Sequence, residues 1–555
     1  MTALLTENLP LLAGAPNGIK KLRELILELA VRGKLVPQEP SDEPASELLN
    51  NIAKEKALLI ENKTIRKGKP LPGIEQDEMQ FKLPIGWEWV RLGQIGDWGA
   101  GATPARGNSR YYDGEMPWFK SGELIADFIS DSEESVTELA LKECSLRRNK
   151  PGDVLIAMYG ATIGKTAILS VEGTTNQAVC ACTPFNGVFN RYLLLTLKAL
   201  KSNFIGQGAG GAQPNISREK IVATVTGLPP LAEQHRIVAK VDELMALCDR
   251  LEAQQTDAES AHAQLVQALL DSLTQASDAT DVAANWQRLA EHFHTLFTTE
   301  PSIDALKQTL LQLAVMGKLV PQDPSDEPAG ELLKRIAEEK ALLVAEGKIR
   351  KTKQLPEITD EERSFAPPNG WEFVRFGQVI ELVSGQHLGP DEYFESARDG
   401  AIPYLTGPAD FGETYPRPTR FTHERRATSI EGDILLTVKG SGVGKTNFVN
   451  QQEFAISRQL MAIRPILVDV QFARNMLFSM SEHFQSKSIG IAIPGISRED
   501  VLDTLIGIPP LPEQHRIVAK VDQLMALCDQ LKTRLSQARQ LNEQLASTLV
   551  EQAVA

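Results

Sequence analysis

Apolar residues recur at alternating steps of four and three in two long stretches of the chain. The first carries them at Ile237, Val241, Leu244, Cys248, Leu251, Ala258, Leu265 and Leu269, and the second at Ile517, Val521, Leu524, Cys528, Leu531, Leu535, Ala538, Leu545 and Leu549. This spacing is typical of a coiled-coil seam. Each stretch follows a Pro-Pro pair, where a helix begins cleanly. We therefore predict two helices of about 40 residues, each roughly 60 Å long at 1.5 Å per residue.

The two predicted helices can pair with each other, or each can pack on its own domain. Three polar residues, Gln255, His262 and Asn542, lie at positions of the predicted seam. In a helix pair such residues would set the register, because a buried polar group specifies which positions face each other. In the other arrangement they are tolerated defects.

Much of the chain is written twice. Residues 229–251 match residues 509–531 at 20 of 23 positions, and residues 28–49 match residues 312–333 at 18 of 22. The chain is thus two copies of a unit of about 280 residues. Such an internal repeat predicts pseudo-twofold symmetry, which favours antiparallel pairing of the long helices. The short amphipathic stretch 303–316 follows the first long helix, whereas its counterpart 19–32 has no long helix before it. The second long helix lies at the C-terminus and can fill that place, so we expect the two termini to meet.

The nearly identical stretches form a constant frame around two inserts, about 85–227 and 369–507. The two inserts share only scattered residues. Each contains short apolar runs with strand character, such as 153–159 and 432–440, between loops rich in Gly and Pro. We interpret both inserts as compact mixed α/β domains. Constant frames around divergent inserts suggest one scaffold that carries two different recognition domains. The alternative is a duplicated enzyme whose second copy has diverged in sequence. Such divergence would not leave the frames nearly identical while the inserts changed.

The composition is that of a globular protein, with 42% hydrophobic and 23% charged residues among 555. No run of about 18 apolar residues is long enough to span a membrane. With no export signal and only five cysteines, we expect a cytoplasmic protein. The net charge of −14 argues weakly against nucleic-acid binding by bulk electrostatics, but not against local basic loops.

Motifs for catalysis are sparse. Gly160 to Thr166 and Gly440 to Thr446 have a Gly-Lys-Thr ending, yet only three residues separate the glycines where a phosphate-binding loop has four. A hairpin that presents Lys165 or Lys445 to a polyanion is the better interpretation. Cys180 and Cys182 lie on one predicted strand without a second pair, so we expect core cysteines and no metal site. His235 and His515 are expected to be structural or to contact a partner.

The sequence around the frames resembles the specificity subunit of type I restriction–modification systems. The recurrent Leu-Pro-Pro-Leu-x-Glu-Gln-x-x-Ile-Val carries this resemblance, together with residues of the first insert: Gly101, Thr103, Pro104, Tyr111, Tyr112, Gly114, Pro117, Trp118, Gly164, Asn176, Gln177, Ile216 and Ser217. The second copy keeps Ile402-Pro403-Tyr404, Gly444, Gln459 and Ile496-Ser497. It has Ser384-Gly-Gln-His387 in place of Gly-x-Thr-Pro, so its early loops cannot be mapped residue by residue.

The resemblance implies a non-catalytic subunit with two target-recognition domains, each reading half of a split site in double-stranded DNA. It implies two long antiparallel helices that set the gap between the half-sites. It also implies two methyltransferase subunits as partners, motor-nuclease subunits that join them, and methylation at adenine N6. This chain would hold no cofactor; S-adenosylmethionine, and ATP with Mg, would be bound by the partners. A coiled-coil scaffold or inhibitor that reads no DNA is the alternative.

Together these features predict an α/β fold of six segments. They are an N-terminal helical segment with a basic linker (1–84), target-recognition domain 1 (85–227), a central coiled-coil helix with an insert (228–316), a connector (317–368), target-recognition domain 2 (369–507) and a C-terminal coiled-coil helix (508–555). The role of residues 276–302 stays open.

Base edges in the major groove are read by Arg at guanine and by Asn or Gln at adenine. Our candidates are therefore polar residues on the Gly-rich loops of the two inserts. They are Arg106, Asn108, Arg110, Lys120, Lys165 and Gln207 in the first insert, and His387, Arg417, Arg420, Lys439, Lys445 and Arg458 in the second. Neither insert has a strong excess of basic residues, so we expect weak DNA binding by this chain alone.

Overall fold

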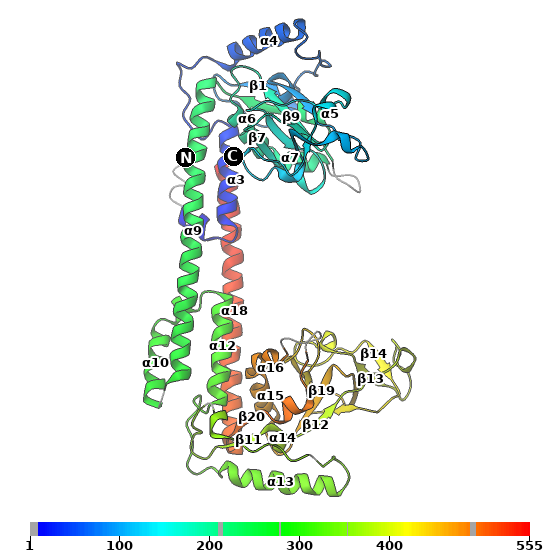
Figure 1. The fold of residues 1–555 in the computed structure, drawn as a ribbon. Helices are drawn as coiled ribbons and strands as arrows, with labels where there is room; N and C mark the ends of the chain where they lie inside the picture. The colour runs from blue at the N-terminus through cyan, green and yellow to red at the C-terminus, as the bar shows by residue number, and fades with distance from the viewer. Residues whose placement is uncertain are drawn as a thin grey trace. The chain divides into compact units, whose positions relative to one another are not determined.

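The computed structural model describes residues 9–208, 215–276, 279–351, 353–363, 365–488 and 495–554. The chain divides into two compact units, Met1–Ala258 with Ala538–Ala555, and Glu259–Gln537 (Figure 1). Each unit contains one of the divergent inserts. The six-segment division is finer than this and stays a prediction, and residues 209–214 of the first Gly-rich insert lie outside the described residues.

The first unit begins with helices and continues into short strands. Its elements are α2 (Leu9–Gly14), α3 (Gly18–Val31), α4 (Ala45–Glu61), β1 (Glu88–Arg91), β2 (Gly96–Ala100), β3 (Tyr112–Phe119), β4 (Phe128–Ile129), β5 (Ser135–Val136), α5 (Glu138–Glu143), β6 (Val154–Ala157), β7 (Thr166–Leu169), β8 (Thr174–Thr175), β9 (Val179–Pro184), α6 (Asn190–Ala199), α7 (Lys201–Gly208), α8 (Arg218–Ala223), β10 (Val225–Leu228) and the start of α9 (Leu231–Gln275).

The strands of the first unit form a main sheet in the order β2-β9-β6-β7-β4, a small sheet in the order β5-β3-β8, and the pair β1-β10. The central strand β6 is apolar on both faces because both are covered. Val154 and Ile156 belong to the core that helix α6 joins, whereas Leu155 and Ala157 belong to a second core on the opposite face. Cys180 and Cys182 on β9 are fully buried in the first core, as predicted.

The second unit repeats this arrangement. Its elements are α10 (Ala279–Glu291), α11 (Phe293–Leu296), α12 (Glu300–Val315), α13 (Ala329–Ala345), β11 (Glu372–Arg375), α14 (Phe376–Val379), β12 (Ile380–Ser384), β13 (Ile402–Leu405), β14 (Arg420–Thr422), β15 (Thr428–Ile430), β16 (Ile434–Thr437), β17 (Thr446–Phe448), β18 (Glu453–Ile456), β19 (Leu460–Pro465), α15 (Val470–Ser479), α16 (Ser481–Lys487), α17 (Arg498–Leu502), β20 (Leu505–Ile508) and α18 (Leu511–Val554). The main sheet runs β12-β19-β16-β17 and the small sheet β14-β13-β18-β15, beside the pair β11-β20. The predicted mixed α/β class is confirmed.

The two long helices are α9 and α18, of 45 and 44 residues. In the first unit, Leu244 and Cys248 near the start of α9 share a core with Ala546 and Ala553 near the end of α18. In the second unit, the end of α9 shares a core with the start of α18. The two helices are therefore antiparallel in each unit. They do not pair alone, because α3 joins the core in one unit and α12 joins it in the other.

The predicted seam is correct at the start of each helix and wrong further along. Ile237 and Cys248 are buried, but Leu265 and Leu545 are 53% and 44% exposed, while the next residues, Val266 and Ala546, are buried. An α-helix has 3.6 residues per turn, so a strict seven-residue repeat drifts by about 20° per heptad. Leu265 and Leu545 lie four heptads after Ile237 and Ile517. By then the buried stripe has drifted by about 80°, close to the roughly 100° that separates successive residues.

This drift also removes the predicted role of the polar seam residues. Gln255 and Asn542 are exposed, so they are not buried register-setting groups. His262 is half-buried, and its Nε2 lies 3.2 Å from the carbonyl oxygen of Thr295, which follows α10. Residues 279–302 of the insert thus fold back on the end of α9, where Asn285 Nδ2 also donates to the Ser272 carbonyl at 2.8 Å.

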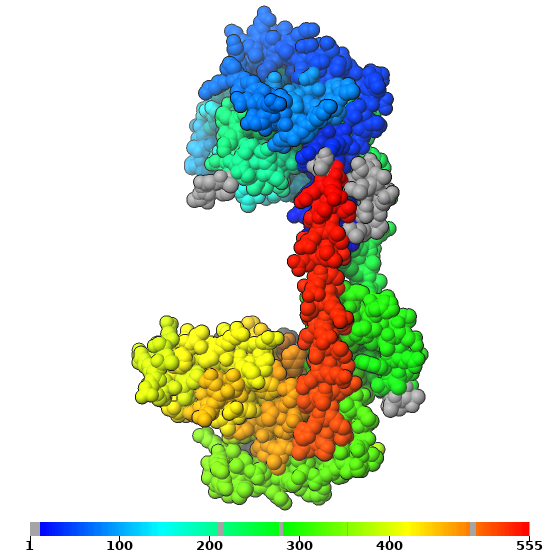
Figure 2. Space-filling view, turned by 180° about the vertical axis from the view of Figure 1, so that it is seen from behind, coloured from blue at the N-terminus to red at the C-terminus, as the bar shows by residue number. Residues whose placement is uncertain are grey.

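The chain ends of the described part meet within the first unit, as predicted. Lys21 on α3 donates a hydrogen bond to Ser547 on α18 at 2.8 Å and lies 3.5 Å from Glu543. Figure 2 shows the C-terminal end of α18, in red, against the N-terminal segment, in blue.

Candidate nucleic-acid interface

The constant Glu-Gln-His-Arg segment that opens α9 fixes the first unit's frame. Glu233 is buried and accepts hydrogen bonds from Gln38 Nε2 at 3.1 Å and from Trp87 Nε1 at 3.0 Å. Burial raises the pKa of this carboxyl, and the two hydrogen bonds oppose the shift. Arg236 forms an ion pair with Asp42 at 2.6 Å. The motif is therefore structural, and sequence reasoning missed these partners because they lie about 150 to 200 residues away.

The histidine of the motif stacks on the insert in the first unit. The ring of His235 lies 4.1 Å from that of Phe189, measured between centroids. In the second unit, His515 Nε2 is 3.6 Å from Asp469 Oδ2. Both residues thus contact the loop that leads into α6 or α15, which agrees with the structural alternative of our prediction.

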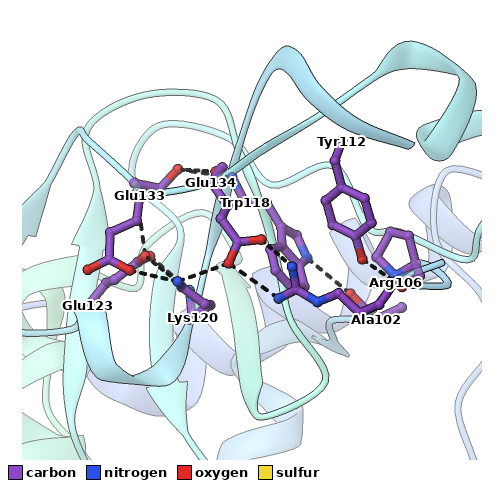
Figure 3. Close-up of polar contacts among 10 residues, drawn as sticks. Ala102, Arg106, Tyr112, Trp118, Lys120, Glu123, Glu133 and Glu134 are labelled. Carbon is purple, nitrogen blue, oxygen red and sulfur yellow. Dashed lines mark hydrogen bonds and ion pairs between the residues drawn. The ribbon is translucent and has the colours of Figure 1, made fainter. Parts of the chain in front are cut away.

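Arg106 contacts two aromatic rings and a carboxylate (Figure 3). Its guanidinium lies 5.0 Å from the Tyr112 ring and 4.9 Å from the Trp118 ring. It also forms a two-point ion pair with Glu134, just before β5. This pairing raises the pKa of Arg106 and lowers the pKa of Glu134. The side chain is half-exposed, but Glu134 neutralises its charge and occupies both of its Nη groups.

Lys120 is likewise surrounded by carboxylates. Its Nζ lies 2.7 Å from Glu133, 3.1 Å from Glu134 and 3.7 Å from Glu123 (Figure 3). The hydrogen bond to Glu133 is the largest cause of its raised pKa. Two cations thus face three carboxylates, so the cluster has a net charge of −1. A DNA phosphate would find no uncompensated positive charge there.

Two other candidates of the same loop lie on a short 3-10 turn, Ser109–Tyr111. Asn108 caps this turn, and its Oδ1 accepts a hydrogen bond from the Arg110 backbone N–H at 3.2 Å. The Arg110 side chain is exposed. Within the described ranges, its guanidinium makes no hydrogen bond or ion pair.

The Gly-Lys-Thr segments form hairpin turns, as predicted. Strand β6 pairs antiparallel with β7, and β16 with β17. Gly160 and Gly164 adopt φ of 59° and 77°, and Gly440 and Gly444 adopt 86° and 89°, which favours glycine at all four. Neither turn is followed by a long helix, unlike a phosphate-binding loop.

The remaining candidates differ in how far their side chains are engaged. Gln207 Nε2 donates to Asn203 within α7, and Arg420 lies 5.0 Å from the Tyr393 ring. Among the residues that the structure describes, six more candidate side chains, like those of Arg110 and Arg420, have no hydrogen bond or ion pair: Lys165, His387, Arg417, Lys439, Lys445 and Arg458. Lys439 and Lys445 flank the same turn between β16 and β17, and both are exposed.

The described part of the chain contains no grouping of three or more His, Cys, Asp or Glu placed to hold a metal ion. In the same part, no helix combines the length and apolar character needed to cross a membrane.

Comparison with known proteins decides the family. The family described as "Type I restriction modification DNA specificity domain" matches the chain twice, at residues 84–259 and 368–539. The chain belongs to this family. Each match of this specificity-domain family spans one insert and the start of the long helix that follows it, so the duplication read from the sequence is a duplication of the family domain.

Curated relatives extend the likeness over nearly the whole chain. The specificity subunit of the type I restriction enzyme EcoAI of Escherichia coli is 38% identical over 563 residues, covering 97% of this chain and 94% of the relative. The EcoEI specificity subunit of the same organism is 36% identical, with the same coverage. Among solved structures, the HsdS subunit from Thermoanaerobacter tengcongensis is 20% identical, with a TM-score of 0.42, over 86% of this chain and 99% of that chain.

Proposed function

We propose that this chain selects the DNA sequence on which a type I restriction–modification complex acts. Its two target-recognition domains would each read one half of a split, asymmetric site in double-stranded DNA. The observation that carries the proposal is the duplicated specificity domain with constant frames and different loops. Unpaired cations are available in both domains: Arg110 and Lys165 in the first, and Arg417, Lys439, Lys445 and Arg458 in the second.

The chain acts in this proposal without catalysing a reaction. Two methyltransferase subunits would bind the frames and supply S-adenosylmethionine for methylation of adenine N6. Motor-nuclease subunits, with ATP and Mg, would complete the restriction complex in the cytoplasm. The antiparallel long helices would act as a rigid spacer, so that the gap between half-sites is a geometric constant, one DNA turn being about 34 Å.

Most phosphate contacts would come from the partners. The net charge of −14 and the neutralised Arg106 and Lys120 both support weak binding by the isolated chain, because non-specific affinity for DNA depends on the number of phosphates that cations neutralise. Nanomolar binding of the chain alone to a duplex in physiological salt would contradict this.

Single-molecule methylome sequencing tests the proposal. A host with the methyltransferase partner is compared with and without this chain. A split N6-methyladenine motif that vanishes with the chain is the expected result. Replacing residues 85–227 with another insert should change one half-site only, and the reciprocal replacement of residues 369–507 should change only the other. If no motif depends on the chain, the scaffold or inhibitor alternative is favoured.

A further inference from the structure

We propose that Arg110 is the base-reading arginine of the first recognition domain, and that Arg106 on the same loop is a positioning residue. This inference rests on the proposed function and assigns roles to two of its candidates. The sequence treats the two arginines alike, since both lie on one Gly-rich loop four residues apart. The structure gives them opposite environments.

Arg106 lies inside a brace that holds the loop on the small sheet. Its guanidinium is stacked on Tyr112 and Trp118, both from β3, and is paired with Glu134, just before β5. Glu134 is fixed from its other side by Lys120 at 3.1 Å. Glu134 occupies the two Nη groups of Arg106, and Tyr112 and Trp118 lie beside its guanidinium, so an end-on contact with a base would have to displace Glu134. Arg106 therefore acts on DNA only through the loop that it holds.

The rings of the brace also bind the loop backbone. Trp118 Nε1 donates to the Ala102 carbonyl at 3.1 Å, and the Tyr112 hydroxyl donates to the Pro104 carbonyl at 2.6 Å (Figure 3). At the base of the loop, a Cβ on Gly101 would stand 2.2 Å from the Thr175 carbonyl oxygen, so only glycine fits there. The loop is thus fixed at several points before it reaches Arg110.

The backbone at Arg110 is held as firmly. Its N–H is bound by Asn108, and its carbonyl accepts a hydrogen bond from Thr137 Oγ1 at 2.8 Å. The next residue, Tyr111, accepts at its carbonyl from the Thr137 N–H at 3.0 Å and donates from its hydroxyl to Glu143 at 2.9 Å. Because the backbone at Arg110 is already fixed, binding has to order only the Arg110 side chain and not the loop, which favours specific contacts.

The surrounding charge favours a base over a phosphate as the partner of Arg110. The elements packed against its turn carry Glu134 and Glu143, and the Arg106–Lys120 cluster has a net negative charge. Carboxylates repel phosphates, whereas the guanine edge offers the neutral acceptors O6 and N7 that suit an arginine fork.

The second domain has different contacts where the first has Arg106, Tyr112 and Trp118. Substitutions at Arg106 or Arg110 should therefore change only the first half-site. Tyr404 takes the position of Trp118 in the Ile-Pro-Tyr run, and its hydroxyl accepts a hydrogen bond from the Leu388 N–H at 3.4 Å. The arginine that stacks on a ring in the second domain is Arg420 of β14, and the ring is that of Tyr393.

The test uses the full chain with its methyltransferase partner and reads methylation motifs together with relative methylation rates on mismatched sites. Arg110→Ala should cost about 10- to 100-fold in discrimination at one position of the first half-site and leave the second half-site unchanged. Arg148→Ala is the matched control, since it removes the same charge from the same domain at a residue paired with Glu138 and Glu172. It should leave both half-sites unchanged.

The role of Arg106 is tested by three variants. Arg106→Met and Glu134→Gln should both loosen discrimination in the first half-site, and Arg106→Lys, which keeps the charge but not the stacked fork, should restore part of it. A melting curve of each variant monitors folding. If Arg106→Met alters the melting temperature without changing first-site discrimination while Glu134→Gln changes neither, the positioning role is overturned.

Other outcomes also decide the question. Uniformly weaker methylation of all sites by Arg110→Ala, with a smaller salt dependence, identifies a phosphate contact and overturns base reading. An unchanged first half-site overturns it as well. If the unaltered chain produces no split motif, the proposed function fails and this inference falls with it, which distinguishes the two failures.

Discussion

Gln234, in the first turn of α9, accepts a hydrogen bond from the backbone N–H of Phe189 at 2.8 Å. Its Nε2 donates to the carbonyls of Pro229 at 3.1 Å and Gly187 at 3.3 Å. Gln514 repeats the arrangement in the second unit, accepting from the Asp469 N–H at 2.9 Å and donating to Pro509 at 3.0 Å. One buried side chain in each frame thus ties the loop before α6 or α15 to a long helix. This explains how the loops can differ while the frames stay constant.

Removing this tie should destabilise the first unit. Gln234→Ala leaves a buried backbone N–H and two carbonyls without their partner, which costs about 1–3 kcal/mol. Urea unfolding followed in the first unit measures the loss. Gln540→Ala, at an exposed position of α18, is the control and should change the free energy of unfolding little. Equal effects of the two substitutions would contradict the role of Gln234.

The stability of the second unit should depend on Arg464, because this residue neutralises a buried carboxylate. It binds Asp433 at two points, both 2.8 Å, and Glu381 at 2.6 Å, and Asp433 is 1% exposed. Burial raises the pKa of Asp433, and the Arg464 guanidinium opposes that shift. Arg464→Met should cost about 3 kcal/mol, because it leaves a buried charge unpaired.

A second substitution separates the lost pair from lost packing. Asp433→Asn in the Arg464→Met chain removes the unpaired charge and should recover part of the stability. Arg425→Met breaks an exposed pair with Glu453 and should cost less than about 1 kcal/mol. If it costs as much as Arg464→Met, burial of Asp433 is not the cause.

Lys340 on α13 should make the stability of the second unit depend on alkaline pH. Its Nζ donates to the carbonyls of Gly377 at 2.6 Å and Ile380 at 3.0 Å, and burial lowers its pKa from 10.5 to about 8. Below pH 8 the folded and unfolded chains are both protonated, and the desolvation cost is present. Between pH 8 and 10.5 only the folded chain has released the proton, so stability rises with pH.

Melting temperatures of the unaltered chain and of Lys340→Met, taken from pH 7 to 10, measure this effect. The difference should shift in favour of the unaltered chain as the pH rises. Lys334→Met, on the same helix, removes an exposed lysine whose pKa is raised by its hydrogen bond to Glu331, and it should not reproduce the trend. A flat or opposite difference would exclude Lys340 as the titrating group.

The packing of the C-terminal part of α18 in the first unit should not tolerate a charged side chain at Ala546. Ala546 is fully buried in the core that contains Leu22 of α3. Ala546→Asp places an unpaired carboxylate there and should cost about 3 kcal/mol or more in the first unit. Thr548→Asp, at an exposed position, is the control. Hydrogen exchange of α3 that is unaffected by Ala546→Asp would refute the contact.

Particular residues show how far the sequence carried the fold and the site. The apolar runs around Leu155 and Leu435 became strands β6 and β16, and the Gly-Lys-Thr segments became hairpins. The start of the heptad pattern was correct at Leu244, but it failed at Leu265, because helix geometry moves the buried stripe away from a strict seven-residue repeat. Arg106 and Lys120 were chosen by residue type and loop position, which do not reveal neutralising partners.

The sequence by itself determined the duplication, the class of each domain, the long helices and the family, because these follow from local periodicity and from identity between its own segments. Only the tertiary structure decided which charges are available to a ligand. Glu134 reaches Arg106 from 28 residues away, and Ser547 reaches Lys21 from 526. Such pairs depend on which segments approach in space, and an electrostatic contact acts over a few ångströms whatever the separation along the chain.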